Sequence, residues 1–324
     1  MERQGNLMSF RPDIKVIDAT LRDGGLVNNF FFEDDFVREL YKANIKAGID
    51  YMEFGYKASV DLFNPKDFGK WKFCKEEDIR NIVGENNSDL KIAVMADVGR
   101  TDFKRDILPR SESVIDMVRI ATYIHQIPAA IEMIEYCHSM GYETSCNIMA
   151  VSTSTETEID LALELLGTSN VDVIYLVDSY GSLYPEQITN LAKVYLEKAK
   201  KYNKIIGIHA HNNQQLAFAN TVEAASIGVS YLDATMLGMG RGAGNCSIEA
   251  LMGFLKNPKF KILPILDFIQ NYMLPLKQNG LVWGYDIPYL ITGQLNVHPR
   301  TAITAIKEND TNYSEFYKST WDKE

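Results

Sequence analysis

Few cysteines, no long apolar run and no surplus of positive charge mark this sequence of 324 residues. Its four cysteines are scattered, and no two have the spacing of a metal-binding or redox pair. Reduced thiols in the cytoplasm are the simplest interpretation. No apolar run approaches the roughly 20 residues that a membrane-spanning helix needs. The polar segment 1–11 lacks the apolar core of a signal peptide. We therefore expect a cytoplasmic protein without a membrane segment.

The net charge of −10 argues against binding to nucleic acids and to anionic membrane surfaces. It leaves room for a small anionic substrate, because a few local cations can hold one. A hydrophobic content of 46% and a charged content of 23% are typical of a soluble globular protein.

Apolar β-rich runs alternate with helical patterns along most of the chain. The predicted strands span 14–23, 51–55, 90–97, 117–122, 143–150, 171–178, 204–211 and 231–237. Helices are predicted over 33–47, 76–86, 128–140, 152–166, 185–201, 214–227 and 247–255. Eight strand-then-helix units over about 250 residues predict a closed parallel (β/α)8 TIM barrel of the α/β class, with an open doubly wound sheet as the alternative.

Two stretches stand apart from this cycle. Residues 56–75 are aromatic and charged without a clear period, and a loop of this length is usually functional or mobile. Residues 258–324 are predicted to form a helical appendage packed on the barrel, with helices over 263–273 and 299–307, and could cover its mouth. The predicted domains are therefore a catalytic barrel over 1–257 and this appendage over 258–324.

A histidine pair gives the clearest sign of function. His209 and His211 are two residues apart at the end of the seventh predicted strand, and residues i and i+2 of a strand face the same side. Two imidazoles that point at one place suggest a divalent metal ion. A packed or hydrogen-bonded pair of histidines is the alternative.

Active sites of (β/α)8 barrels lie at the carboxyl ends of the strands. Residues that fall there or nearby could complete the site; they are Arg22, Asp23, Glu53, Arg119, Asp178, Ser179 and Asn245. Ligation by nitrogen and oxygen without thiolate suits Mg2+, Mn2+, Co2+ or Zn2+. An open octahedral site with waters would favour Mg2+ or Mn2+.

Several motifs resemble the metal-dependent pyruvate aldolase and lyase superfamily, whose members include hydroxymethylglutaryl-CoA lyase and the isopropylmalate and homocitrate synthases. The similarity is closest to 4-hydroxy-2-oxovalerate aldolase and extends over about residues 16–255. The motifs are Thr20-Leu-Arg-Asp-Gly24, Val118-Arg-Ile-Ala-Thr122, Ile174-Tyr-Leu-Val-Asp-Ser179, His209-Ala-His-Asn212 and Gly238-Met-Gly-Arg-Gly-Ala-Gly-Asn245.

The resemblance implies a metal site and an enolate-forming reaction. Asp23, His209 and His211 would be metal ligands. Asn245 would be a fourth ligand, or would lie just behind the ligands. The metal would act as a Lewis acid on the oxygen of an enolate formed by cleavage of a carbon–carbon bond next to a 2-oxo acid.

The same resemblance implies roles for the surrounding residues. Arg22 would stabilise the enolate oxygen, and Glu53 would orient Arg22 or a metal-bound water. Ser179 would bind the carboxylate or carbonyl of the substrate. Arg119 is a further candidate for substrate binding, or else fills the barrel interior.

Residue 26 departs from the family pattern. The aldolases have Asp-Gly-Met-His after the arginine, and that histidine is the catalytic base, whereas residues 23–26 here are Asp-Gly-Gly-Leu. Leu26 cannot transfer a proton. The candidates for the missing base are Tyr289, which we include in the predicted catalytic set, and also His298, Tyr285, Tyr180 or a metal-bound hydroxide.

The predicted function is a divalent-metal-dependent aldolase or lyase acting on a small 2-oxo acid. The alternatives are a synthase that condenses an acyl-CoA with a 2-oxo acid, a barrel that acts only as a binding partner, and a metal-dependent hydrolase. A homodimer is the default expectation. A dehydrogenase partner, which the related aldolase has, is not carried over, because the resemblance fades after residue 258.

Overall fold

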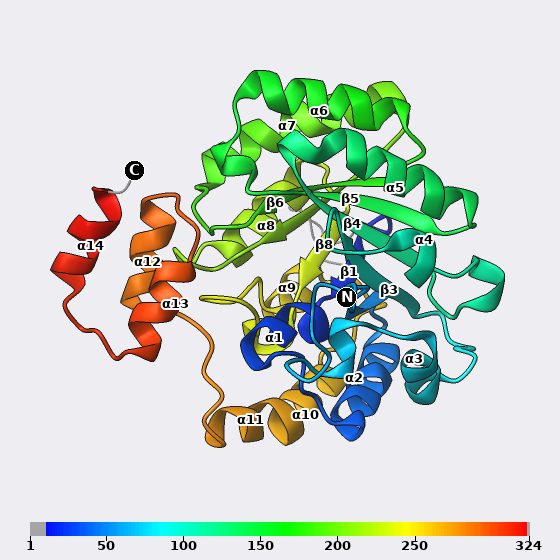
Figure 1. Ribbon diagram of the computed structural model, residues 1–324, viewed down its shortest axis with the longest axis horizontal. Helices are drawn as coiled ribbons and strands as arrows, with labels where there is room; N and C mark the ends of the chain where they lie inside the picture. The colour runs from blue at the N-terminus through cyan, green and yellow to red at the C-terminus, as the bar shows by residue number, and fades with distance from the viewer. Residues whose placement is uncertain (1–10, 323–324) are drawn as a thin grey trace.

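A closed barrel of parallel strands, in the order β1 to β8, forms the centre of the molecule (Figure 1). The structure is a computed structural model that describes residues 11–322. Residues 1–10 and 323–324 lie outside the described residues. The first of these ranges includes most of segment 1–11, in which no signal peptide was expected. The strands are β1 (Lys15–Asp18), β2 (Tyr51–Tyr56), β3 (Lys91–Asp97), β4 (Met117–Tyr123), β5 (Glu143–Met149), β6 (Val173–Asp178), β7 (Ile205–Ala210) and β8 (Tyr231–Ala234). The predicted (β/α)8 barrel is confirmed.

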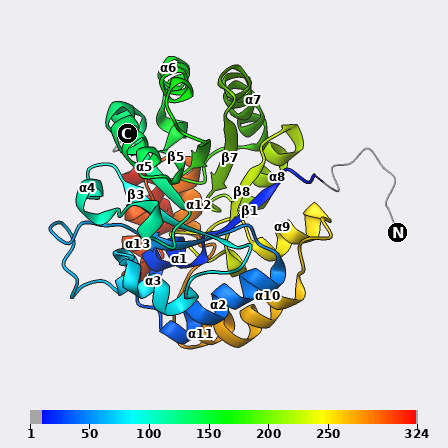
Figure 2. The same cartoon turned by 90° about the vertical axis from the view of Figure 1, so that its right-hand side faces the viewer.

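Helices surround the strands on all sides, as the view along the barrel shows (Figure 2). The helices of the cycle are α2 (Asp34–Ala47), α3 (Glu76–Val83), α5 (Ile127–Ser139), α6 (Glu156–Thr168), α7 (Pro185–Tyr202), α8 (Ala217–Ile227) and α9 (Ile248–Leu255), with a short α4 (Phe103–Asp106) in addition. Local sequence sets several of their starts. Thr155 caps α6 by accepting the backbone N–H of Glu158, and Pro185 occupies the first position of α7, where its missing N–H costs nothing.

The first predicted strand is wrong in its second half. Residues 14–23 were expected to be extended, but β1 ends at Asp18 and α1 (Thr20–Asn28) begins two residues later. The Asp18 carboxylate accepts the backbone N–H of Thr20 at 2.9 Å and so satisfies one free donor at the helix start. Gly25 lies inside α1, where a Cβ would be 2.1 Å from the ring of Phe30.

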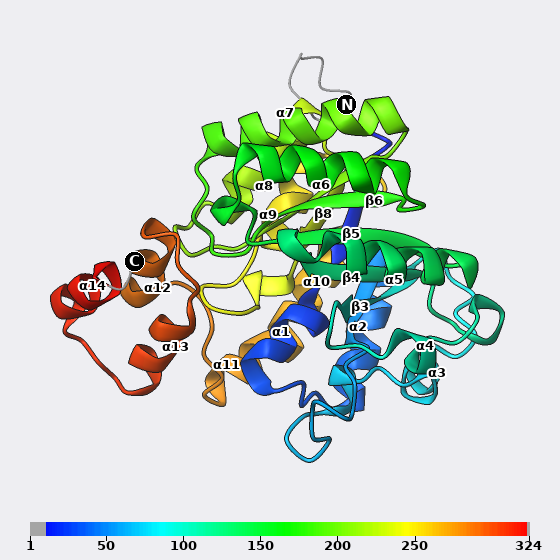
Figure 3. The ribbon, with the colours of Figure 1, turned by 45° about the horizontal axis from the view of Figure 1, so that its top comes forward.

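The C-terminal segment contacts the barrel in two places (Figures 1 and 3). The helical run α10 (Leu263–Phe268), a π-helical turn (Ile269–Met273) and α11 (Leu274–Gln278) follows the barrel, and the ring of Phe268 packs on Phe36 of α2 at 5.1 Å. The helices α12 (Ile287–Gln294), α13 (Arg300–Lys307) and α14 (Tyr313–Trp321) then form a separate group. Helices were expected over 263–273 and 299–307, whereas α12 and α14 were not anticipated. The domain boundary after residue 257 remains a prediction.

The second group lies at the barrel mouth. Asn296, just after α12, accepts a hydrogen bond from Ser182 at 2.7 Å and donates one to the carbonyl of Ser152 at 3.1 Å. The side chain of Asn213 contacts the carbonyl of Tyr289 at 3.5 Å. Because Ser152, Ser182 and Asn213 follow β5, β6 and β7, helix α12 stands over the carboxyl ends of these strands.

All four cysteines are buried free thiols, as the scattered spacing predicted. Within residues 11–322, none of the helices combines the length and the apolar content that crossing a membrane requires.

Candidate metal site

Helix α1 brings an arginine, an aspartate and a leucine to the barrel mouth on one face. Arg22 and Leu26 are four residues apart and Asp23 and Leu26 three apart, so the three side chains are neighbours on the helix surface. All three line a cavity of about 50 Å3 at the carboxyl ends of the strands. Asp23 lies in the first turn of α1, where the positive end of the helix dipole favours a carboxylate.

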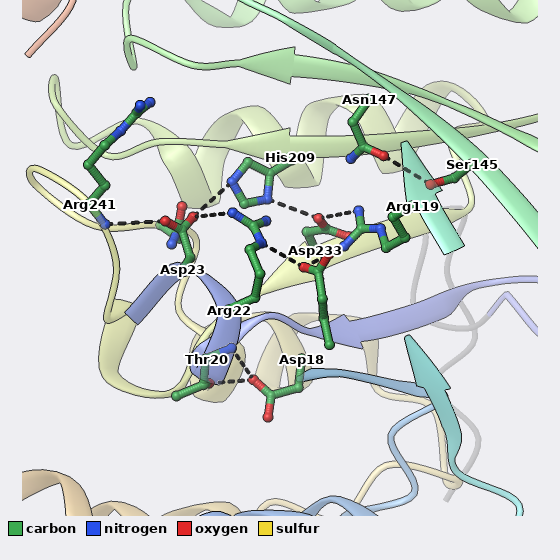
Figure 4. A network of polar contacts seen from close by, with 12 residues as sticks. Asp18, Thr20, Arg22, Asp23, Arg119, Ser145, Asn147, His209, Asp233 and Arg241 are labelled. Carbon is green, nitrogen blue, oxygen red and sulfur yellow. Dashed lines mark hydrogen bonds and ion pairs between the residues drawn. The ribbon is translucent and has the colours of Figure 1, made fainter. Parts of the chain in front are cut away.

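The two histidines converge on Asp23 as their spacing predicted. His209 is in β7 and His211 follows it, paired with Asn245 in an isolated bridge. Their rings lie 5.0 Å apart. The Oδ2 atom of Asp23 is 3.1 Å from His209 Nε2 (Figure 4) and 3.8 Å from His211 Nε2.

These three residues fit a divalent cation. Ligand atoms from all of them lie within 4.8 Å of one another. Ligands at right angles around an ion with bonds of about 2.1 Å would be about 3 Å apart, close to the separations seen. Asp23 Oδ2 and His209 Nε2 are fully buried. They lie 3.1 Å apart, and Arg22 Nη1 lies 3.3 Å from Asp23 Oδ2, but neither atom forms a hydrogen bond with the described residues. An ion between them would give both atoms a ligand bond.

The charge states also suit a cation. Burial opposes ionisation of Asp23, but Arg22 and the two imidazoles outweigh it and hold the pKa of Asp23 well below its usual range. Burial lowers the pKa of His211 well below its usual value, so that its ring is neutral. Burial also disfavours a charge on His209, but Asp23 and Asp233 raise its pKa, so a cation at Nε2 would replace a proton there.

Asp233 in β8 fixes the orientation of His209. Its Oδ2 lies 2.9 Å from His209 Nδ1, which places the proton on Nδ1 and leaves Nε2 free to bind a metal. Arg119 Nη2 donates to the same Oδ2 at 2.7 Å, and Arg119 Nη1 donates to Glu53 Oε2 at 2.8 Å. Glu53 Oε2 in turn accepts from Arg22 Nε at 2.8 Å. This buried chain of charges runs from the histidine to the arginine beside Asp23 (Figure 4).

Most of the predicted site residues meet at this cavity. Arg22, Asp23, Ser179, His209 and His211 line it. The Ser179 Oγ accepts the backbone N–H of Ala150 at 2.8 Å, so its own hydroxyl proton remains available to a substrate.

Asn245 lies against the same cluster. A Cβ at Gly240 would be 2.1 Å from Asn245 Nδ2 and 3.2 Å from Asp23 Cγ, so both side chains lie over one glycine. The Oδ1 of Asn245 is buried and forms no hydrogen bond with the described residues. This placement agrees with both predicted roles of Asn245, as a fourth ligand or as a residue just behind the ligands.

Four further predicted residues, Glu53, Arg119, Asp178 and Tyr289, do not line the cavity. Arg119 does not line the cavity; it is fully buried inside the barrel between Glu53 and Asp233, with its guanidinium 4.5 Å from the ring centre of Tyr175. This matches the alternative of an interior residue. Tyr289 borders a separate cleft of about 440 Å3 between the Gly238–Asn245 loop and helices α12 and α13. Leu26 and Arg241 border both spaces.

Sequence reasoning missed four residues of the site: Tyr56, Asn147, Asp233 and Arg241. Arg241 donates its backbone N–H to Asp23 Oδ1 at 3.3 Å and its Nη2 to the carbonyl of Ser179 at 3.0 Å. Asn147 accepts from Ser145 at 2.9 Å and lines the cavity. Asp233 lies two residues into β8, where a buried acid was a signal that could have been used. Arg241 stood within the Gly238–Asn245 motif, from which only Asn245 was predicted to belong to the site.

Comparison with known proteins identifies the family. A family model described as HMGL-like matches residues 13–270. The chain belongs to the HMGL-like family. It is 29% identical over 245 residues to oxaloacetate decarboxylase from Mycobacterium tuberculosis, covering 74% of this chain and 69% of that protein. It is 28% identical over 252 residues to 4-hydroxy-2-oxovalerate aldolase from Pelotomaculum thermopropionicum, covering 78% and 72%.

Solved structures give the same result. The N-terminal domain of a provisionally named aldolase from Bacteroides vulgatus is 28% identical, with a TM-score of 0.79 over 90% of this chain and 96% of that one. HMG-CoA lyase from Brucella melitensis is 14% identical, with a TM-score of 0.58 over 87% and 96%, and this likeness concerns the fold alone. The predicted resemblance to the aldolase and lyase group is confirmed.

Proposed function

We propose that this HMGL-like protein is a divalent-metal-dependent lyase that breaks or forms a carbon–carbon bond next to a 2-oxo acid through a pyruvate-type enolate. The observation that carries the proposal is the buried cluster of Asp23, His209 and His211 beside Arg22, in a cavity at the barrel mouth. The names of the similar proteins, aldolases and a decarboxylase, support the same class of reaction.

Asp23, His209 and His211 would hold the ion, with Asn245 as a possible fourth ligand or close neighbour. A bound divalent ion supplies a Lewis acid for the carbonyl oxygen of the substrate. Mn2+ or Mg2+ is proposed because the set contains nitrogen and oxygen but no thiolate, and Co2+ or Zn2+ could also bind.

Arg22 is held ready to stabilise the enolate oxygen. Glu53 fixes its Nε, and Asp23 lies 3.3 Å from its Nη1, so the guanidinium reaches the cavity in one orientation. Burial works against its charge, but Glu53 and Asp23 raise the pKa of Arg22 well above its usual value, so the guanidinium stays charged. A preorganised donor of this kind is typically worth about 3–4 kcal/mol of barrier.

The substrate carboxylate is proposed to bind on the opposite side of the cavity, near Ser179 and Arg241. The Ser179 hydroxyl can donate one hydrogen bond, and the Arg241 guanidinium, anchored on the Ser179 carbonyl, supplies positive charge at the rim. Asn147 can add an amide donor from β5.

Decarboxylation of a 3-carboxylated 2-oxo acid such as oxaloacetate is a second candidate reaction. It yields the same enolate as aldol cleavage but requires no base to remove a hydroxyl proton. Leu26 in place of the base therefore favours it, and a similar protein from M. tuberculosis is named for this activity. The condensing synthase, the hydrolase and the purely binding barrel have no comparable support. We keep the cytoplasm and a homodimer as proposals and propose no dehydrogenase partner.

The test is exchange of the methyl protons of pyruvate in D2O, followed by NMR, with the Mn2+-loaded protein. Exchange requires reversible enolate formation and does not depend on the identity of the second substrate. The proposal expects exchange that is lost in Asp23→Asn and reduced about 100-fold or more in Arg22→Ala. Absence of exchange with pyruvate and with other short 2-oxo acids, together with no turnover of oxaloacetate or 4-hydroxy-2-oxovalerate, would refute it. Relative rates on oxaloacetate and 4-hydroxy-2-oxovalerate then distinguish the two reactions.

A further inference from the structure

An enolate formed in this cavity must receive a proton on carbon, and the residue expected to handle protons is absent at position 26. Besides the three predicted metal ligands, the ionisable side chains lining the cavity are Arg22, Arg241 and Tyr56. Both arginines remain protonated under ordinary conditions. Tyr56 is thus the one remaining ionisable side chain of this lining that can give up a proton.

A bulge in β2 turns Tyr56 toward the cavity. Glu53 pairs with Ala93 of β3, but Tyr56 pairs with Met95, so three residues of β2 span two residues of β3. Without the extra residue, alternation would place Tyr56 on the opposite face from Glu53, toward the helices. With the extra residue, Tyr56 lies on the same face of the sheet as its partner Met95, which also lines the cavity. Bulges commonly re-aim side chains at the rims of barrels.

Gly55 makes this bulge possible. A Cβ at this position would be 1.9 Å from the carbonyl oxygen of Trp71, so the backbone of the 57–75 loop lies directly against the strand. The loop in turn places a cation on the tyrosine: the Nζ of Lys72 is 4.5 Å from the centre of the Tyr56 ring. Phe30 meets the same ring edge-on at 5.7 Å.

The surroundings leave the hydroxyl of Tyr56 available. The side chain is 9% exposed, yet its hydroxyl forms no hydrogen bond with the residues from 11 to 322 that appear in the structure. Burial raises the pKa of Tyr56, and Arg22 only partly offsets this effect, so the group is a neutral O–H donor at physiological pH.

We propose that Tyr56 is the proton donor that converts the enolate to the 2-oxo acid product, an inference that rests on the proposed function. The Tyr56 Oη–H bond breaks and its proton goes to C3 of the enolate. The electron pair of the C2–C3 double bond forms the new C3–H bond, and the C2–O carbonyl is restored. The phenolate that remains lies near Arg22 and Lys72 and regains a proton from water. No oxidant or further reactant is needed.

This assignment explains why a leucine is tolerated at position 26. None of the other candidate side chains lines this cavity. Tyr285 and Tyr289 border the neighbouring cleft, His298 lies behind Arg241, 3.5 Å from its Nη1, and the ring of Tyr180 packs on that of His298 at 5.8 Å. In decarboxylation no hydroxyl must be deprotonated, so one acid at Tyr56 is sufficient for the whole proton balance.

The test compares Tyr56→Phe with wild-type protein and with Tyr195→Phe as a matched control, because Tyr195 is a buried tyrosine of α7 whose hydroxyl also has no hydrogen-bond partner among the described residues and does not line the cavity. Phenylalanine keeps the ring against Lys72 and Phe30, and only the hydroxyl is lost. Two readouts separate proton transfer from enolate formation. The first is exchange of pyruvate methyl protons in D2O, and the second is oxidation of the enolate by ferricyanide while oxaloacetate or 4-hydroxy-2-oxovalerate is consumed. Mn2+ content and thermal melting are measured on every variant.

We expect exchange in Tyr56→Phe to fall about 10²–10⁴-fold, the usual range for loss of a general acid. Ferricyanide reduction should continue, and Mn2+ content should be unchanged. Exchange in Tyr195→Phe should equal that of the wild type. Exchange at the wild-type rate in Tyr56→Phe, or equal loss of both readouts, would overturn the inference. A wild type that neither exchanges the methyl protons of pyruvate nor turns over oxaloacetate or 4-hydroxy-2-oxovalerate would refute the proposed function instead.

Discussion

Replacement of Asp233 by asparagine should weaken metal binding although Asp233 does not touch the ion site. The change keeps the size of the side chain but removes its charge. Asp233 orients His209 through Nδ1 at 2.9 Å and is itself held by Arg119 at 2.7 Å. If the NH2 group of the asparagine faces His209 or Arg119, that donor no longer has an acceptor. The imidazole would then no longer be held in one tautomer.

The size of the effect follows from this contact. Loss of a partner behind a metal-binding histidine typically lowers affinity about 10–100-fold, which corresponds to about 1.4–2.7 kcal/mol. Removal of one partner of a buried ion pair typically costs roughly 3–5 kcal/mol of folding stability. The loss in Asp233→Asn should be smaller, because Arg119 keeps its ion pair with Glu53.

The assay is calorimetric titration of the metal-free protein with Mn2+, with thermal melting in parallel. Asp178→Asn is the matched control, because Asp178 is equally buried at the end of β6 but accepts only the backbone N–H groups of Ser182 and Leu183. Burial raises the pKa of Asp178 to about 7, so titrations near pH 8 compare two ionised carboxylates. The control should lose stability and keep its Mn2+ affinity. Unchanged affinity in Asp233→Asn would refute the reasoning.

Three further predictions concern the rim of the site. Gly240→Ala should lower Mn2+ affinity in titrations because its Cβ would be 2.1 Å from Asn245 Nδ2, whereas Gly253→Ala, which meets nothing within 4 Å, should bind normally; equal affinities would contradict this. Leu26→His should raise aldol cleavage of 4-hydroxy-2-oxovalerate, assayed as pyruvate release, more than decarboxylation of oxaloacetate, because only cleavage requires a base; a uniform change would count against it. Burial and then Arg241 lower the pKa of His298 to about 4. Between about pH 6.5 and 4 the unfolded protein therefore binds a proton at His298 that the folded protein does not bind. As the pH is lowered through this range, the melting temperature should fall by more in the wild type than in His298→Asn. Parallel pH profiles would show that His298 does not contribute.

Much of the fold could be predicted from the sequence because its signals are local. Apolar runs alternating with helical periods gave the order of the barrel units, and the two-residue spacing of His209 and His211 put both imidazoles on one side of a strand. Residues 19–23 were mistaken for the end of a strand, because helix α1 starts through a contact between Asp18 and Thr20 that no periodicity reveals.

The sequence by itself determined the barrel and the histidine pair, since strand order and side-chain alternation are properties of short stretches, and the resemblance of its motifs to a known family added Asp23 as their partner. Only the tertiary structure decided which groups surround them. Asp233 reaches His209 because β7 and β8 are neighbours, and Arg241 folds back over Asp23 because the Gly238–Asn245 loop turns sharply. Tyr56 faces the cavity because one extra residue in β2 reverses its side. These placements depend on pairing between segments far apart in the chain, which no local pattern specifies.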